Sequence, residues 1–269
     1  MFDFAAEQAV TIEDKLQLLI AGPSGAGKSH LIGTYPGKTL LITLGAETHG
    51  AASAKKSNPN LIAVYADRDK AGALLTPEQT TTRLLTMLDP AAIKAGGFAF
   101  VAIDGLTELE KLVRATGIWK NMCQTKSGGH DSFKETTSTI TLMDQVLNKL
   151  INLQFELGID VAVTCILDVK STNSKTGEIE EGQPRLQGYS IAEGRIQMFG
   201  DIITIGQMQG ANGVGRVIQM HTDLTRKSVN QDTQEVKKIF GITPRLQGVA
   251  NIPNFIKADL SELLKLKGR

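Results

Sequence analysis

The chain has 269 residues, of which 41% are hydrophobic and 21% are charged, and these fractions are ordinary for a globular protein. This length suits one α/β core with additional segments. The 29 basic residues nearly balance the 28 acidic ones, which excludes a protein that coats nucleic acid through its overall charge but leaves a local groove open.

The first residues, MFDFAAEQAVTIEDK, lack the basic segment and the following apolar segment that mark a signal peptide. No apolar stretch approaches the roughly 20 residues that a membrane span needs. The two cysteines, Cys123 and Cys165, do not have the spacing of a zinc site or of a disulfide framework. We therefore expect a cytoplasmic protein that has no membrane partner.

Short apolar segments separated by helical patterns predict an α/β fold with a mainly parallel sheet. Several segments are apolar at consecutive positions, as expected for strands that are covered on both faces. The predicted strands span residues 16–22, 39–44, 61–66, 98–104, 160–167 and 201–208. A further strand is expected at 216–221, after the glycine-rich segment QGANGVG, and would form an antiparallel hairpin with 201–208 at the sheet edge.

Helical patterns lie between these strands. A capping box with proline at the first helical position begins one helix at 76–79, and leucines at helical spacing predict another over 106–113. The longest helix is expected over 139–157. We expect a core over 1–210 and a C-terminal extension, 211–269, that consists of the hairpin and a helix packed on the core.

Two polar segments, 120–137 and 168–188, are predicted to be loops, and loops of this length usually have a function or are disordered. The pentapeptide PRLQG occurs at 184–188 and again at 244–248. Five residues do not establish a repeat architecture, so chance and a duplicated turn both remain open.

The most specific motif is GPSGAGKS, which matches G-x-x-x-x-G-K-S/T between a predicted strand and a helical segment. Its glycines allow the backbone to approach phosphates closely, and the N–H groups of the loop would surround them. Lys28 is expected to bind the β- and γ-phosphates, and the Ser29 hydroxyl to bind Mg²⁺. The predicted nucleotide contacts are Gly22, Pro23, Ser24, Gly25, Ala26, Gly27, Lys28, Ser29 and His30.

Other polar residues follow or interrupt the predicted strands. FAFVAID ends in Asp104, at the strand edge where ligands of α/β sheets bind, and this carboxylate is expected to hold Mg²⁺ through water. Thr164 interrupts the VAVTCIL strand where a γ-phosphate sensor would stand, although threonine is also common in strands. Glu47 and Glu108 are alternative candidates for the group that positions the attacking water. Taken alone, a glutamate at either position is more often a solvated surface acid.

These segments resemble the phage and prophage RecA-like ATPases, which carry an AAA-type description and include ATPases of phage single-strand annealing and recombination. The likeness covers roughly residues 14–250. It rests on LLIAGPSGAGKS, TLLITLGAETHG, VAIDGLTELEKL and VAVTCIL, and on the pattern FGDIITI…RVIQMHTD…PRLQG. It implies a RecA-like P-loop NTPase core in which a third strand separates the P-loop strand from the Asp104 strand. It also implies ATP and Mg²⁺ as ligands, and a location in the host cytoplasm.

The resemblance further implies a homo-oligomer in which a basic residue completes the site of a neighbouring subunit. Arg245 is the candidate for this catalytic role, and Arg226 and Lys227 are its rivals. The segments 120–137 and 168–188 stand where RecA-like proteins carry DNA-binding loops, so single-stranded DNA is the implied partner. The first segment contains several lysines and an aromatic side chain, whereas the second is not net basic.

Three functions are compatible with this pattern. The first is an oligomeric ATPase that acts on single-stranded DNA in recombination, repair or replication. The second is an ATP-driven switch or assembly factor with a protein partner, which the near-neutral charge would suit. The third, a small-molecule kinase, needs an arginine-rich lid that the sequence does not predict. A GTPase is disfavoured because no N-K-x-D motif follows the late strands.

Overall fold

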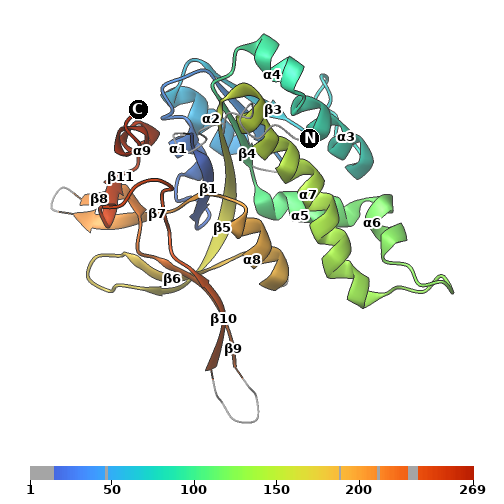
Figure 1. Cartoon of the computed structure of the whole chain (residues 1–269). Helices are drawn as coiled ribbons and strands as arrows, with labels where there is room; N and C mark the ends of the chain where they lie inside the picture. Colours follow the sequence, from blue (N-terminus) through green and yellow to red (C-terminus); the bar gives the residue numbers. More distant parts are fainter. Residues whose placement is uncertain (1–14, 46–47, 188, 211–212, 230–235) are drawn as a thin grey trace, which may run out of the picture.

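A mainly parallel sheet forms the middle layer of the molecule (Figure 1). The computed structural model describes residues 15–45, 48–187, 189–210, 213–229 and 236–269. The parallel strands are β1 (Gln17–Gly22), β2 (Thr39–Thr43), β3 (Leu61–Tyr65), β4 (Phe100–Asp104), β5 (Asp160–Thr172) and β7 (Asp201–Gly210). They pair in the order β3-β2-β4-β5-β1-β7, so β5 separates the strand before the P-loop motif from the strand that ends at Asp104, as expected.

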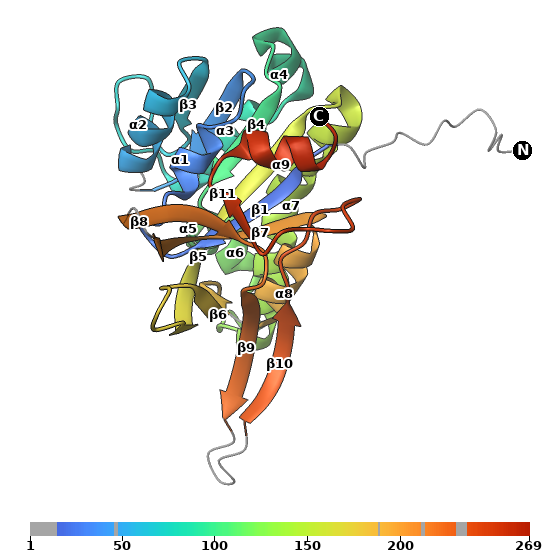
Figure 2. The ribbon, with the colours of Figure 1, turned by 90° about the vertical axis from the view of Figure 1, so that its left-hand side faces the viewer.

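Antiparallel strands extend this sheet. They are β6 (Ile179–Pro184), β8 (Gly213–Gln219), β9 (Asp223–Val229), β10 (Val236–Ile242) and β11 (Phe255–Lys257). β8 pairs with β7, which confirms the predicted hairpin. β11 pairs with β8 on its other side, so the hairpin does not form the edge of the sheet. The boundary placed after residue 210 falls within this paired hairpin. β9 and β10 form a second hairpin, which sequence patterns did not identify and which projects from the body of the molecule (Figure 2).

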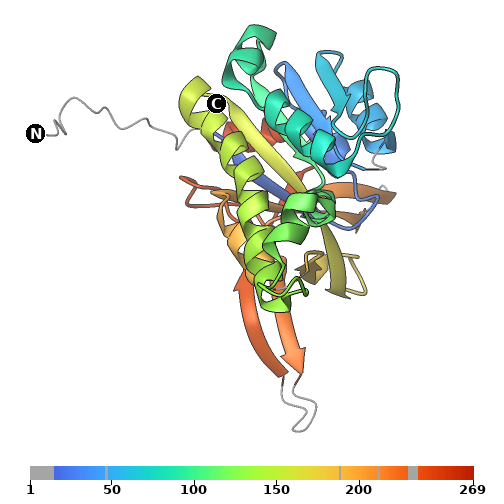
Figure 3. The ribbon, with the colours of Figure 1, turned by 90° about the vertical axis from the view of Figure 1, so that its right-hand side faces the viewer.

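Helices cover both faces of the sheet (Figure 3). One face carries α1 (Lys28–Ile32), α2 (Thr48–Ser57) and α9 (Leu260–Leu266). The other carries α3 (Pro77–Met87), α4 (Pro90–Gly96), α5 (Leu106–Ala115), α6 (Gly117–Met122), α7 (Ser132–Leu157) and α8 (Tyr189–Gln197). In the part of the chain that the structure describes, each helix is too short or too polar to cross a bilayer.

Strand side chains alternate between these two helical layers. On β1, Leu18 and Ile20 pack in the α1 layer, whereas Leu19 and Ala21 pack in the α7 layer. All four side chains are buried. This burial on both faces explains why the strands are apolar at consecutive positions of the sequence.

Both ends of the first predicted loop, 120–137, are helical, and a loop remains between them. α6 extends to Met122, and α7 begins at Ser132, where the Asp131 carboxylate accepts a hydrogen bond from the backbone N–H of Phe133. The expected helix start at residue 139 was therefore wrong. The first turns of α7 are largely exposed and polar, so no apolar stripe marked them.

The second predicted loop, 168–188, is largely a β-hairpin. β5 continues to Thr172, and β6 pairs with it in antiparallel orientation. In the turn, the Asn173 side-chain oxygen accepts hydrogen bonds from two backbone N–H groups, and Gly177 has a positive φ of 73°. The strands of this hairpin are polar on much of their surface, so hydrophobic periodicity did not reveal them.

The first four residues of PRLQG, at 184–187 and 244–247, make similar contacts in both copies. In each copy the arginine N–H bonds a strand carbonyl, and the leucine is buried. The glutamine N–H donates to a buried carboxylate in both, which is Glu110 for Gln187 (2.9 Å) and Asp201 for Gln247 (2.8 Å). The two copies therefore share a local structural role, as expected of a duplicated turn.

Candidate functional site

The GPSGAGKS segment forms a loop between β1 and α1, at the carboxyl end of the parallel strands. Gly25 and Gly27 have φ values of 78° and 102°, which residues with a side chain rarely adopt. A Cβ on Gly22 would lie 2.7 Å from Cγ2 of Ile205, so only glycine fits there without a shift. The Lys28 ammonium reaches back across the loop and donates to the carbonyl oxygens of Gly22 and Pro23, each at 2.9 Å.

Asp104 contacts the residues that the sequence assigned to the same site. Its Oδ2 accepts a hydrogen bond from the Ser29 hydroxyl at 2.5 Å, and its Oδ1 accepts one from the Thr164 hydroxyl at 2.6 Å. All three side chains are buried, and Asp104 is 2% exposed. The end of β4, the start of α1 and the middle of β5 therefore meet at one carboxylate.

The alternation of strand side chains causes this meeting. On β4, Phe100 and Ala102 pack in the layer of α1, so Asp104 points to the same side of the sheet. On β5, Ala162 packs in that layer, and Thr164 follows it by two residues. Both polar side chains therefore face the helix that begins immediately after the P-loop.

The oxygens of Ser29 and Asp104 fit the requirements of Mg²⁺. This ion takes oxygen ligands at 2.0–2.1 Å and is usually held by one or two carboxylates together with substrate phosphates. A Cβ built on Gly50 of α2 would lie 2.4 Å from Ser29 Oγ and 3.4 Å from Asp104 Oδ2. Glycine at this position therefore leaves room for the Ser29 hydroxyl beside the Asp104 carboxylate. Among the described residues there is no group of three or more His, Cys, Asp or Glu that could hold a metal alone, so phosphate and water would supply further ligands.

His30 follows Ser29 on α1 and faces α2. Its Nδ1 lies 3.0 Å from the hydroxyl of Ser57 and 3.4 Å from that of Ser53. The ring also lines a cavity beside the P-loop. His30, which is predicted to contact the nucleotide, therefore lies next to the P-loop, and two serine hydroxyls orient its ring.

The structure describes one of the two candidates for the water-positioning acid. Glu47 lies outside the described residues. Glu108 forms an ion pair with Lys111 at 2.7 Å and faces Gly45, where a Cβ would lie 2.9 Å from its carboxylate. It lines a separate cavity of about 300 Å³, whose wall also includes Leu44 and Gly45, which follow β2, and residues of α3. The structure therefore brings Asp104 and Thr164 to the P-loop but places Glu108 among other partners.

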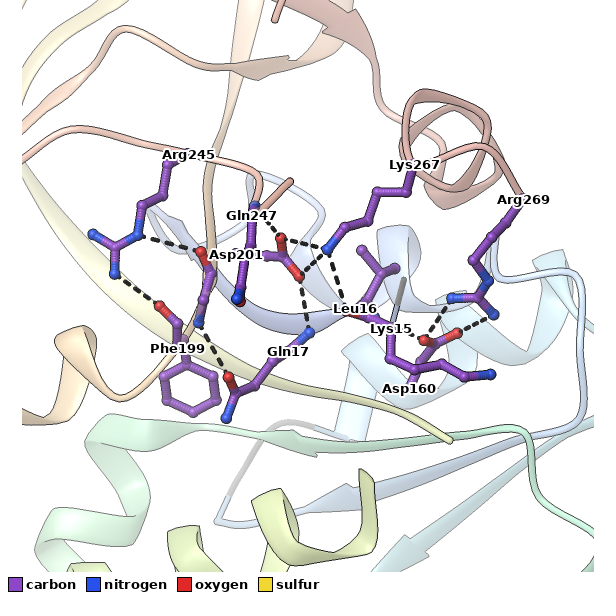
Figure 4. Close-up of polar contacts among 11 residues, drawn as sticks. Lys15, Leu16, Gln17, Asp160, Phe199, Asp201, Arg245, Gln247, Lys267 and Arg269 are labelled. Atoms are coloured by element: carbon purple, nitrogen blue, oxygen red, sulfur yellow. Dashed lines mark hydrogen bonds and ion pairs between the residues drawn. The ribbon is translucent and has the colours of Figure 1, made fainter. Parts of the chain in front are cut away.

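Arg245 pairs with Ile202 near the amino-terminal end of β7, whereas the P-loop follows the carboxyl end of β1. Figure 4 shows Arg245 beside Phe199. Its guanidinium donates to the carbonyl oxygens of Phe199 at 2.9 Å and Gly200 at 3.2 Å. Arg226 and Lys227 lie on β9, and their side chains are outside the described part of the structure. The role of any of these residues in a neighbouring site stays a prediction.

A cation that the sequence analysis missed lies beside the P-loop. Nε of Arg216, on β8, would be 2.8 Å from a Cβ on Gly27. Gln207 is the directly opposite residue on β7. The glycine-rich segment QGANGVG predicted the hairpin that carries both residues, but only the strand order brings this hairpin next to the P-loop.

Cys165 lies on the other face of the sheet, in the layer of α5 and α7. Burial raises the pKa of its thiol to about 12, so the thiol is neutral at physiological pH. Its side chain therefore fits a core position and not that of a nucleophile.

No model of a protein family matches this chain, and no curated protein matches it. The geometry of the site therefore has to support any proposal about function.

Proposed function

We propose that this chain has a RecA-like P-loop NTPase core that binds ATP with Mg²⁺ and hydrolyses the triphosphate. The observation that carries this proposal is the contact of Asp104 with both Ser29 and Thr164 at the end of the P-loop strand. Phosphoryl transfer needs little covalent chemistry from the protein, and it depends on positioning and on charge. This site supplies both.

Each residue has a distinct part in this proposal. The Lys28 ammonium exchanges the carbonyls of Gly22 and Pro23 for the β- and γ-phosphates and neutralises their charge. Ser29 and Asp104 hold Mg²⁺, which when bound orients the phosphates and withdraws charge from them. Thr164 keeps the carboxylate oriented through its hydrogen bond and lies next to the position of the terminal phosphate.

For the partner, we propose single-stranded DNA, bound near the corner between α6 and α7. Phe133 at the start of α7 is 93% exposed, and Lys126 and Lys134 lie in the same corner. Exposed aromatic rings stack on unpaired bases, and nearby cations bind the phosphate backbone. The β5–β6 hairpin is a weaker candidate because residues 168–188 are not net basic.

The DNA proposal is tested by the anisotropy of a labelled oligothymidylate. Stacking contributes about 1–3 kcal/mol per base, so Phe133→Ala should weaken binding about five- to 150-fold. Phe155→Ala is the matched control, because Phe155 is also exposed but lies at the other end of α7. Equal affinities for parent and Phe133→Ala would contradict this location.

ATP turnover with and without single-stranded DNA tests the combined function. A rate that depends on Mg²⁺ and rises with DNA supports the proposal, and a rate that also rises with protein concentration supports the proposed homo-oligomer. A turnover rate that does not change when DNA is added would favour the alternative of an ATP-driven switch or assembly factor with a protein partner.

A further inference from the structure

A cavity of about 650 Å³ opens beside the P-loop. Its wall does not include Lys28, Ser29 or Asp104, which were assigned above to the phosphates and the metal. α1 contributes His30 to its wall, β7 contributes Gln207, and β8 contributes Val214 and Arg216. Lys257 of β11 completes this part of the wall. The volume lies in the range of small-molecule sites.

The strand order determines which part of a triphosphate reaches this cavity. Asp104 and Thr164 lie on β4 and β5, to one side of β1. The cavity lies against β7, β8 and β11, to the other side of β1. A triphosphate whose terminal phosphate lies at Asp104 therefore extends across the P-loop toward this cavity. We infer that the cavity binds the nucleoside half of the triphosphate, and that Gln207 selects adenine; this inference rests on the proposed function.

The orientation of Gln207 follows from its strand. It pairs directly with Arg216 on β8, so both side chains lie on one face of the hairpin. Ile205, two residues before Gln207, shares that face and contacts Gly22 of the P-loop. The face of the hairpin that bears Gln207 and Arg216 is therefore the face turned to the nucleotide.

The chemistry of the wall favours adenine over guanine. A glutamine amide offers a donor and an acceptor side by side, which match N7 and N6–H₂ of adenine. None of the described residues that line the cavity has a carboxylate, the group that would accept hydrogen bonds from the N1–H and N2–H₂ donors of guanine. The Arg216 guanidinium and the Val214 side chain offer a planar and an apolar surface to the base.

Arg216 lies at the border between the two halves of the ligand. Its side chain is next to Gly27 of the P-loop and also lines the cavity. This position brings its charge close to the phosphates, so Arg216 contributes to binding of any triphosphate. Gln207 contributes only when a base is present.

Calorimetric titration with MgATP, MgGTP and magnesium tripolyphosphate separates these contributions. The parent protein should bind ATP about tenfold more tightly than GTP, and Gln207→Ala should remove this difference, which corresponds to 1.4 kcal/mol. The same variant should bind tripolyphosphate as the parent does. Arg216→Ala should weaken ATP and tripolyphosphate alike. Gln209→Ala is the control, because Gln209 is two residues further along β7, on the same face but outside the cavity.

Equal affinities of the parent for ATP and GTP, or a Gln207→Ala variant that retains the preference, would overturn the inference. A Lys28→Ala variant distinguishes this failure from that of the proposed function. If Lys28→Ala weakens tripolyphosphate but Gln207→Ala leaves the ATP preference intact, only the nucleoside location is wrong. If no triphosphate binds, or if Lys28→Ala has no effect on binding, the P-loop function and the inference are both wrong.

Discussion

The Ser29 hydroxyl lies 2.5 Å from Oδ2 of Asp104, although 75 residues separate the two along the chain. In the sheet, β5 lies between β4, which ends at Asp104, and β1, which precedes the loop that leads to Ser29. Thr164 of β5 binds the second oxygen of the same carboxylate. Three segments that a P-loop ATPase requires in one place therefore meet here. The predictions below concern this meeting point and the framework that holds it.

Asp104→Asn should leave nucleotide binding measurable and lower Mg²⁺-dependent hydrolysis by about 10²-fold, the cost of losing one preorganised charge near the phosphates. The variant keeps the size of the side chain and removes its charge. Turnover measured across a magnesium titration tests this expectation. Superimposable curves for variant and parent would exclude Asp104 from the metal site.

Gly50→Ala should weaken the Mg²⁺-dependent part of nucleotide binding about tenfold, because its Cβ would lie 2.4 Å from the Ser29 hydroxyl. Gly194→Ala is the control: Gly194 is also in a helix, and a Cβ there meets no atom within 4 Å. Both substitutions replace a helical glycine by alanine, which favours the helical conformation. A loss of affinity that is limited to Gly50→Ala is therefore caused by the close contact with the Ser29 hydroxyl. The same magnesium dependence in the two variants would mean that a side chain at position 50 does not disturb the metal site.

Lys267→Met should lower the free energy of unfolding by about 3–5 kcal/mol, because it leaves the Asp201 carboxylate buried without its cation. Lys267 Nζ lies 2.9 Å from Asp201, and both side chains are at most 2% exposed (Figure 4). Lys265→Met is the control, since Lys265 is 66% exposed on the same helix and should change nothing measurable. Urea unfolding of the two variants gives the comparison, and similar midpoints would show that the buried pair does not stabilise the fold.

Glu110→Gln should change how stability depends on pH. Burial raises the pKa of Glu110 above its usual value of 4.5, against the lowering effects of the Gln187 N–H and Arg114. A carboxyl whose pKa is raised in the folded state contributes stability below the unfolded pKa and loses it as pH rises through the folded pKa. The unfolding free energy of the parent minus that of Glu110→Gln should therefore fall as pH rises above 4.5. A difference that stays constant or rises would contradict the raised pKa.

The sequence predicted the centre of the site because each of its residues lies at a recognisable place, either in an apolar strand or in a motif of fixed spacing. Asp104 ends one strand, Thr164 interrupts another, and Lys28 belongs to a motif with fixed spacing. The alternation of side chains then places the first two on the same face of the sheet. Local pattern and strand period were sufficient for this part.

The residues that the sequence did not reveal depend on how distant elements pack. Gly50 matters because α2 crosses directly above Ser29, and Arg216 matters because β8 is two strands away from β1. Neither relationship can be recognised from the pattern of neighbouring residues in the sequence. The hairpin of β5 and β6 was missed for a different reason, since its polar strands lack the apolar periodicity by which strands are recognised.

The central claim is that the loop around Lys28 binds the triphosphate of MgATP. Calorimetric titration of MgATP into the parent and into Lys28→Ala, with the fold of each checked by thermal unfolding, tests it most directly. We predict saturable binding to the parent and a loss of at least tenfold in affinity for a variant that unfolds at the same temperature. Equal affinities in two equally stable proteins would contradict the P-loop assignment and every proposal that rests on it.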